Sequence, residues 1–77
     1  MSTWRTRTFV MPISIGGRHF RLYPQKPKGK MWECWVTEGD EKWDDPISTG
    51  DYSQTDTLAS AAEYLMIHVL NPEGDID

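Results

Sequence analysis

The chain is poor in the features that mark disulfide-rich, zinc-binding and membrane proteins. Its 77 residues contain one cysteine, Cys34, which excludes an internal disulfide framework and a cysteine-based zinc site. No apolar run approaches the roughly 20 residues that cross a bilayer. Residues 1–11 also lack the apolar core and small-residue cleavage site of a secretory signal. We therefore expect one small soluble domain in a reducing compartment, the cytoplasm.

Residues that carry catalysis or hold metals are also scarce. His19 and His68 lie far apart in the sequence, and neither has a second ligand at metal spacing. Cys34 lies within a strand-like pattern, where burial would raise its pKa and suppress the thiolate. The pair Gly16-Gly17 suits a tight turn rather than a phosphate-binding loop. We therefore expect no enzymatic activity, no metal and no cofactor.

Acidic residues are absent from the first part of the chain. Residues 1–31 carry seven basic side chains, whereas residues 32–77 carry all twelve acids and one lysine, which gives the formal net charge of −4. Such a separation favours a charged partner. Alternatively, basic and acidic strands laid side by side would neutralise each other within the fold.

Two alternating segments predict an N-terminal hairpin. Residues 5–15 alternate apolar and polar side chains, which is typical of a strand with one buried face. Pro12 cannot donate to a ladder, so it predicts either an edge strand or a bulge at this position. Gly16-Gly17 supplies the positive φ angles of a two-residue turn. Residues 18–23 form the second strand, with Phe20 and Leu22 directed inward.

The middle of the chain predicts one or two further strands. Residues 24–30 form a basic loop because two prolines and a glycine interrupt regular structure. A third strand covers 31–38, and a short fourth strand over 42–45 is ended by Pro46. Residues 46–55 are expected to form an irregular connection.

Residues 56–70 show the periodicity of an amphipathic helix. Asp56 or Thr55 is expected to cap its first turn, and Asn71-Pro72 to end it. We expect residues 1–72 to form a single domain and residues 73–77 a disordered acidic tail. The apolar stripe of the predicted helix consists of Leu58, Ala61, Ala62, Leu65, Met66 and Val69.

These elements predict an α+β fold. A small antiparallel sheet of three to four strands, beginning with the N-terminal hairpin, carries one C-terminal helix on one face. A single helix covers only one side of such a sheet, so we expect the other side to meet water or a partner. Trp32 and Trp35 have opposite strand parity and cannot both face the helix.

Tryptophans and carboxylates cluster in the third strand and the loops after it. Tryptophan is over-represented at binding hot spots, and aligned carboxylates can imitate the phosphates of a nucleic acid. We therefore expect a non-enzymatic module that binds a protein partner with a basic surface, such as a nucleic-acid-handling complex. The predicted partner-binding residues are Glu33, Trp35, Glu38, Asp40, Glu41, Trp43, Asp44 and Asp45.

Two other functions remain open from the sequence. Basic residues of the hairpin and the following loop could bind single-stranded DNA or RNA, although the net negative charge argues against it. A self-associating structural subunit, a homodimer joined through the open sheet face, is the third possibility. The predicted nucleic-acid-binding residues are Arg18, His19, Arg21, Tyr23, Lys26, Lys28 and Lys30.

The residues Asp56-Thr57-Leu58-Ala59-Ser60-Ala61-Ala62, following several strands, form a capped helix start. Strands followed by such a helix resemble antitoxin domains of the HicB type and small inhibitors encoded by phages. The similar stretch is short and carries no specific motif, so it implies an architecture and no site residues. In length and acidity the chain is similar to phage anti-defence proteins, including the anti-CRISPR class, which implies an inhibitor.

Overall fold

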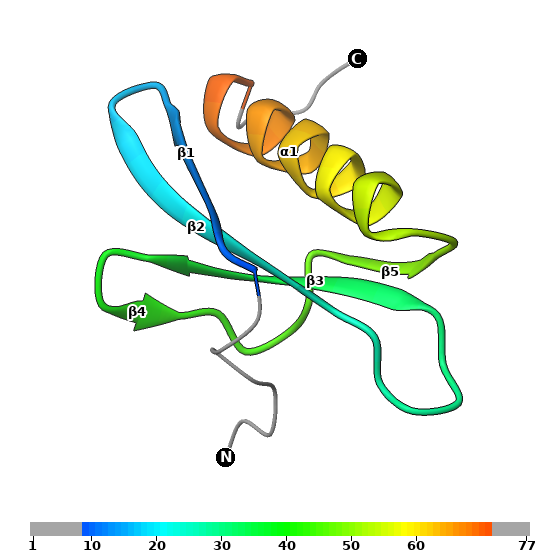
Figure 1. Cartoon of the computed structure of the whole chain (residues 1–77). Coiled ribbons are helices and arrows are strands. Elements are labelled where there is room, and N and C mark those ends of the chain that lie inside the picture. The colour runs from blue at the N-terminus through cyan, green and yellow to red at the C-terminus, as the bar shows by residue number, and fades with distance from the viewer. Residues whose placement is uncertain (1–8, 72–77) are drawn as a thin grey trace.

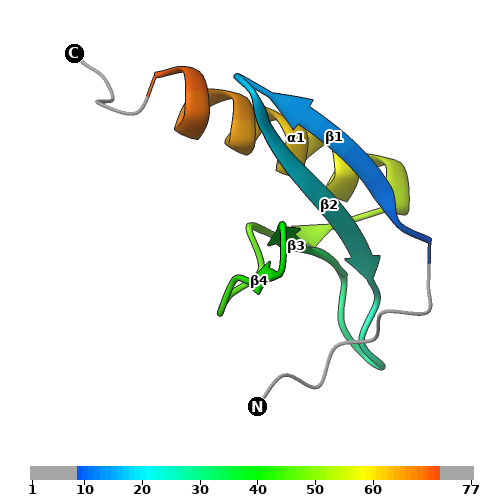
Figure 2. The ribbon, with the colours of Figure 1, turned by 90° about the vertical axis from the view of Figure 1, so that its left-hand side faces the viewer.

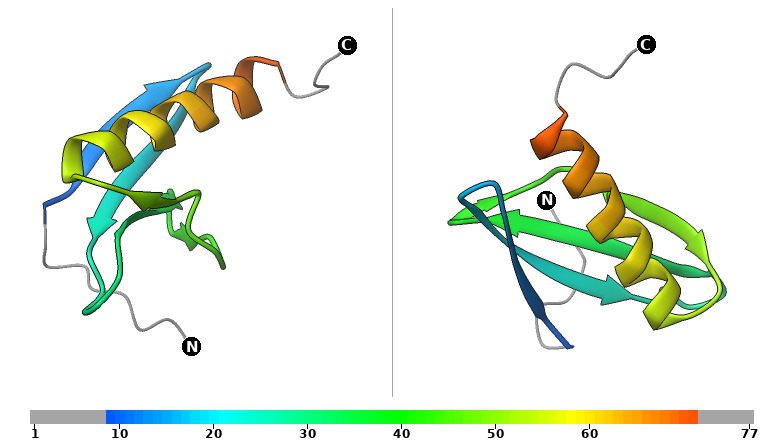
Figure 3. Two further views of the ribbon diagram at one scale, coloured as in Figure 1. Left: turned by 90° about the vertical axis from the view of Figure 1, so that its right-hand side faces the viewer. Right: turned by 90° about the horizontal axis from the view of Figure 1, so that it is seen from above.

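Five strands and one helix make up residues 9–71, the part of the chain that the computed structural model describes (Figure 1). The helix lies across one face of the sheet (Figure 3), which confirms the predicted α+β fold with its N-terminal hairpin. The predicted start of the first strand, residues 5–8, and the predicted acidic tail lie outside the described residues. The elements are β1 (Met11–Ile15), β2 (Arg18–Gln25), β3 (Trp32–Glu38), β4 (Glu41–Lys42), β5 (Ser48–Asp51) and α1 (Gln54–Leu70).

All strand pairs are antiparallel, and β3 has two partners along one of its edges. The strand order is β1-β2-β3-β4, and β5 also pairs with β3. The start of β3 pairs with β5, where Trp32 lies opposite Asp51. The end of β3 pairs with β4, where Thr37 lies opposite Lys42. Viewed from the side, α1 runs along the far side of β1 and β2 (Figure 2).

The hairpin forms as its sequence predicts. Gly16 and Gly17 have φ angles of +57° and +81°, the left-handed conformations that a two-residue turn between twisted strands requires. Within residues 9–71, β1 pairs with β2 alone and is an edge strand, which is one of the two alternatives that Pro12 predicts. In an antiparallel hairpin, hydrogen-bonded pairs alternate with pairs that exchange no hydrogen bonds. Counting from the hydrogen-bonded pair Ile15 and Arg18 at the turn, Pro12 and Arg21 form a pair of the second kind. The backbone nitrogen of Pro12 therefore points away from β2, and its missing N–H removes no hydrogen bond of the sheet.

The hydrophobic core lies between α1 and the sheet. Alternate residues of the strands face the helix, and α1 contributes Ala61 and Leu65, four residues apart, as its periodicity predicts. The predicted stripe residue Met66 is an exception, because it is 48% exposed. The half-buried Met11, Ile13, Trp43, Ile47, Leu58 and Val69 surround this core. The buried core residues are Ile15, Phe20, Leu22, Cys34, Val36, Ala61 and Leu65.

Two stretches predicted as irregular contain strand. Strand β2 continues through Pro24 and Gln25, because β1 begins opposite Leu22 and the proline therefore interrupts no pairing with β1. Residues 46–55, expected to be irregular, contain β5. Its sequence Ser-Thr-Gly-Asp has no apolar alternation, and its pairing with β3 is what makes it a strand.

Helix α1 begins earlier than its sequence predicts. Ser53 is the N-cap, and its Oγ accepts a hydrogen bond from the backbone N–H of Asp56 at 3.0 Å. The predicted cap at Asp56 or Thr55 is therefore wrong; Asp56 lies in the first turn, where its charge complements the helix dipole. The predicted end is confirmed, since the N–H of Asn71 donates to the Ile67 carbonyl at 2.9 Å.

The sheet face opposite α1 is only partly open. Tyr23, Gln25 and Thr37 project from that face and are buried, and the hydroxyls of Tyr23 and Thr37 lie 3.3 Å apart. His19 and Arg21 are exposed on the same face. The expectation that this whole face would meet water or a partner is therefore wrong for its central part.

The two turn glycines give a matched test of the hairpin. We expect Gly16→Ala and Gly17→Ala each to lose about 1 kcal/mol of unfolding free energy, because both residues have positive φ. Gly16→Ala should lose more, since its Cβ would lie 3.0 Å from Cγ1 of Val69, whereas no atom of residues 9–71 lies within 4 Å of the corresponding position at Gly17. Urea unfolding measures both variants. Equal losses would contradict the close approach of the turn to α1.

Candidate protein-binding site

The short segment between β4 and β5 is hydrogen-bonded to β3 at both of its ends, and the residues between these two points project from the sheet. The N–H of Trp43 donates to the Val36 carbonyl at 3.2 Å, and the N–H of Ile47 donates to the Cys34 carbonyl at 2.9 Å. Residues 44–46 lie between these two attachments, opposite a single residue of β3. The surplus residues therefore loop away from the sheet, as in a β-bulge.

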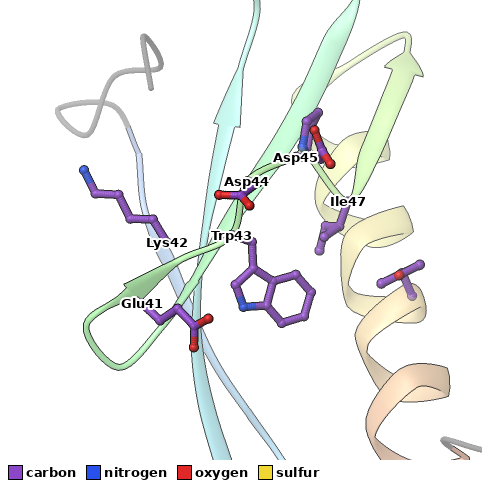
Figure 4. A pocket seen from close by; sticks show the side chains of 8 residues that line it. Glu41, Lys42, Trp43, Asp44, Asp45 and Ile47 are labelled. Carbon is purple, nitrogen blue, oxygen red and sulfur yellow. The ribbon is translucent and has the colours of Figure 1, made fainter. Parts of the chain in front are cut away.

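This loop and α1 enclose a hollow of about 440 Å³ (Figure 4). The indole of Trp43 points from the loop toward α1, with Asp44 and Asp45 on the same segment. Three carboxylates and one lysine supply the charged groups, so the hollow is net acidic. Its lining residues are Glu41, Lys42, Trp43, Asp44, Asp45, Pro46, Ile47 and Tyr64.

Aromatic contacts fix the rings that line the hollow. Trp43 meets Phe20 edge to face at 6.2 Å between ring centroids, and His68 at 5.8 Å. Tyr64 stacks on His68 at 5.9 Å with nearly parallel rings. Such pairs contribute about 0.5–1.5 kcal/mol each beyond the area that they bury. The half-buried Trp43 is therefore a fixed wall of the hollow that presents its remaining surface to solvent.

An ion pair removes one carboxylate from the acidic surface. Arg18 donates to both oxygens of Glu38, from Nε and Nη2, at 2.7 Å each. Its guanidinium also lies 5.3 Å from the ring centroid of Phe20. These two hydrogen bonds lower the pKa of Glu38 and raise the pKa of Arg18. Both side chains stay partly exposed, so we expect salt to weaken the pair.

The structure divides the predicted partner-binding residues. Glu41, Trp43, Asp44 and Asp45 come together at the hollow. Asp40 is exposed in the turn between β3 and β4 and does not line the hollow.

The other three predicted residues of this set lie apart from the hollow. Glu38 is paired with Arg18. Glu33 and Trp35 lie on the sheet face opposite α1, where the indole Nε1 donates to Glu33 Oε2 at 2.8 Å. As predicted, Trp32 and Trp35 occupy opposite faces of β3. A surface that combines all eight predicted residues is therefore not formed.

Four lining residues of the hollow are absent from the predicted set: Lys42, Pro46 and Ile47 are neighbours of predicted residues in the sequence, whereas Tyr64 is distant from them. Tyr64 lies beside the apolar stripe of α1, and the residue spacing of the helix predicts no contact between this position and the segment after β4. Its place opposite Trp43 follows from how α1 crosses the sheet. Aromatic character at a flank position is the sequence signal that could have indicated it.

The predicted nucleic-acid-binding residues are also divided. Arg18 is paired with Glu38 on the α1 side of the sheet, and Tyr23 is buried. His19 and Arg21 are exposed on the opposite face, where Nδ1 of His19 lies 2.8 Å from the hydroxyl of Ser14. They line a second hollow of about 430 Å³. Lys26, Lys28 and Lys30 are exposed in the loop between β2 and β3.

Cys34 is enclosed by the core. Its residue is fully buried, and this burial raises the pKa of its thiol to about 12. Within residues 9–71, no three histidine, cysteine or acidic side chains are grouped to hold a metal ion. In that same part of the chain, α1 is too short and too polar to span a bilayer.

Comparison with known proteins adds no assignment to this geometry. No family model matches the chain, and no curated protein or solved structure matches it.

The thiol of Cys34 gives a chemical test of the core. We expect iodoacetamide to leave the native protein unmodified at mildly alkaline pH, because the thiol is buried and its thiolate is disfavoured. The denatured protein should react fully, which serves as the control. Mass spectrometry measures both. Rapid alkylation of the folded protein would show that β3 is accessible beneath α1.

The Arg18–Glu38 pair predicts a pH dependence of stability. The pKa of Glu38 is lower in the folded chain, so the pair stabilises the fold above the ordinary glutamate pKa, about 4.3. This stabilisation is lost as the pH falls through the lowered folded value. Glu38→Gln should therefore be less stable than wild type near neutral pH and equal to it in acid. Thermal unfolding at several pH values measures the difference, and a pH-independent difference would contradict the pairing.

Proposed function

We propose that the protein is a non-enzymatic module that binds a basic segment of another protein in the acidic hollow beside Trp43. The observation that carries this proposal is the grouping of Glu41, Asp44 and Asp45 around an indole held by Phe20 and His68. The carboxylates attract a cationic segment, and the indole offers it a rigid apolar surface.

Physical chemistry assigns different roles to these groups. Exposed carboxylates mainly steer the encounter and select for positive charge, and their effect weakens as salt rises. A fixed aromatic ring contributes contact area without losing much side-chain entropy on binding. Trp43 is already ordered by two ring contacts, so little freedom is lost when a partner covers it. The combination favours selective binding over nonspecific attraction.

A phosphate-binding surface is the basic partner that this proposal favours. Lysines and arginines that are spaced to neutralise phosphates would also fit the carboxylates of the hollow. Occupation of such a surface would exclude nucleic acid from a nucleic-acid-handling complex. This is the mode of action that the resemblance to small phage inhibitors of the anti-defence class implies.

A second candidate function is the binding of single-stranded nucleic acid. One observation favours it: within the described residues, no carboxylate lies within 4 Å of the exposed Arg21 or of the three loop lysines. The loss of Arg18 and Tyr23 from that surface, and the net charge of −4, weigh against it. A mobility-shift assay with single-stranded DNA at low salt tests this candidate.

A labelled lysine-rich peptide tests the leading proposal by fluorescence anisotropy. We expect binding at low salt that weakens as salt rises, and a loss of about tenfold in Asp44→Asn/Asp45→Asn. The control is Glu33→Gln/Asp56→Asn, which removes the same charge away from the hollow and keeps an acceptor for Trp35. Equal weakening in both variants would show a response to net charge alone and would reject the hollow as the site.

A further inference from the structure

Helix α1 carries an exposed apolar row that begins at the acidic hollow. Tyr64, Ile67 and Leu70 are 47%, 57% and 64% exposed. Their spacing of three residues places each beside the next along the helix surface. Because Tyr64 also lines the hollow, the row and the hollow form one continuous surface. We call these three residues the outer row.

The outer row changes the character of α1 along its length. The first turns are polar on the side away from the sheet, where Asp56 and Glu63 are exposed. The last turns direct Leu65 into the core and Val69 against it, while Ile67 and Leu70 face outward. A helix segment that is apolar on both sides is typically buried on both sides. The outer row is thus a continuous apolar part of this helix that lacks a cover among the described residues, and Met66 is a further exposed apolar residue outside it.

We propose that the partner segment is amphipathic, with basic side chains that enter the hollow and apolar side chains that cover Ile67 and Leu70. This inference rests on the proposed function and adds the chemistry of the segment. Charge complementarity selects its basic part, since Glu41, Asp44 and Asp45 lie at the Tyr64 end of the row. A purely basic segment would leave the rest of the row exposed.

The two parts of such a segment would contribute differently to binding. Attraction to the carboxylates speeds association and is screened by salt, whereas burial of apolar side chains slows dissociation and is not. The net acidic hollow favours a cationic partner over a second copy of this chain, whose formal net charge is −4. Phosphate backbones are disfavoured by the same carboxylates.

Two synthetic peptides of equal length and lysine content test the inference. One places leucine along one helical face, and the other has serine at those positions. We expect the wild-type protein to bind the lysine–leucine peptide about tenfold tighter than the lysine–serine peptide, as anisotropy measures. Ile67→Gln/Leu70→Gln should remove this preference and leave binding of the lysine–serine peptide unchanged.

Two further variants guard the interpretation. Ile67→Gln alone should lose part of the preference, and it avoids Leu70, which lies close to the Gly16 turn. Tyr52→Gln is the matched control, because Tyr52 is 86% exposed and precedes the other end of α1. It should keep the full preference. Thermal unfolding by circular dichroism confirms that each variant is folded.

Each outcome separates the inference from the proposed function. Equal affinity of wild type for both peptides, or an undiminished preference in Ile67→Gln/Leu70→Gln, would overturn the amphipathic segment and leave the acidic hollow standing. Failure of both peptides to bind would overturn both proposals. Concentration-dependent dimerisation that disappears in the double variant, measured by sedimentation, would show that a second copy covers the row.

Discussion

The contact of Trp43 with Phe20 and His68 is the constraint on which the candidate site depends. Strand β4 has two residues, and the segment after it loops away from β3, so neither could hold a fixed position alone. The indole joins this segment to β2 and α1 at once. The packing of the Trp43 indole positions Asp44 and Asp45, which follow it in the sequence, on the same hollow as Tyr64. One ring therefore serves the core on one side and the hollow on the other.

Regular patterns made most of the fold predictable from the sequence. Alternation over β1 and β2, the Gly16-Gly17 turn and the periodicity of α1 each express a local preference that the tertiary structure keeps. Strand β5 could not be predicted, because its four polar and glycine residues become a strand only through pairing with β3. The helix start was misplaced for a related reason: several polar residues precede α1, and only the backbone geometry shows that Ser53 caps it.

The candidate site was less predictable than the fold. Closeness in sequence grouped the tryptophans and carboxylates of residues 33–45, but strand alternation sends Glu33 and Trp35 to the face opposite Trp43. The pairing of β2 with β3 then brings Arg18 within reach of Glu38. Tyr64 comes from a segment distant in sequence. A surface built from two faces and a helix flank depends on tertiary geometry that no local pattern contains.

Folding leaves the exposed basic side chains of the described residues outside the acidic hollow, with Lys42 as the exception. Pairing of β2 with β3 could have neutralised the basic and acidic halves, yet Arg21 lies opposite Thr37, and the Arg18–Glu38 pair is what joins the halves within the described residues. Arg21 and the lysines of the β2–β3 loop are exposed and do not line the hollow that Asp44 and Asp45 line. A basic partner of the proposed kind would therefore be attracted to the side of the hollow. The charge separation that predicts a charged partner from the sequence would also orient that partner on the folded chain.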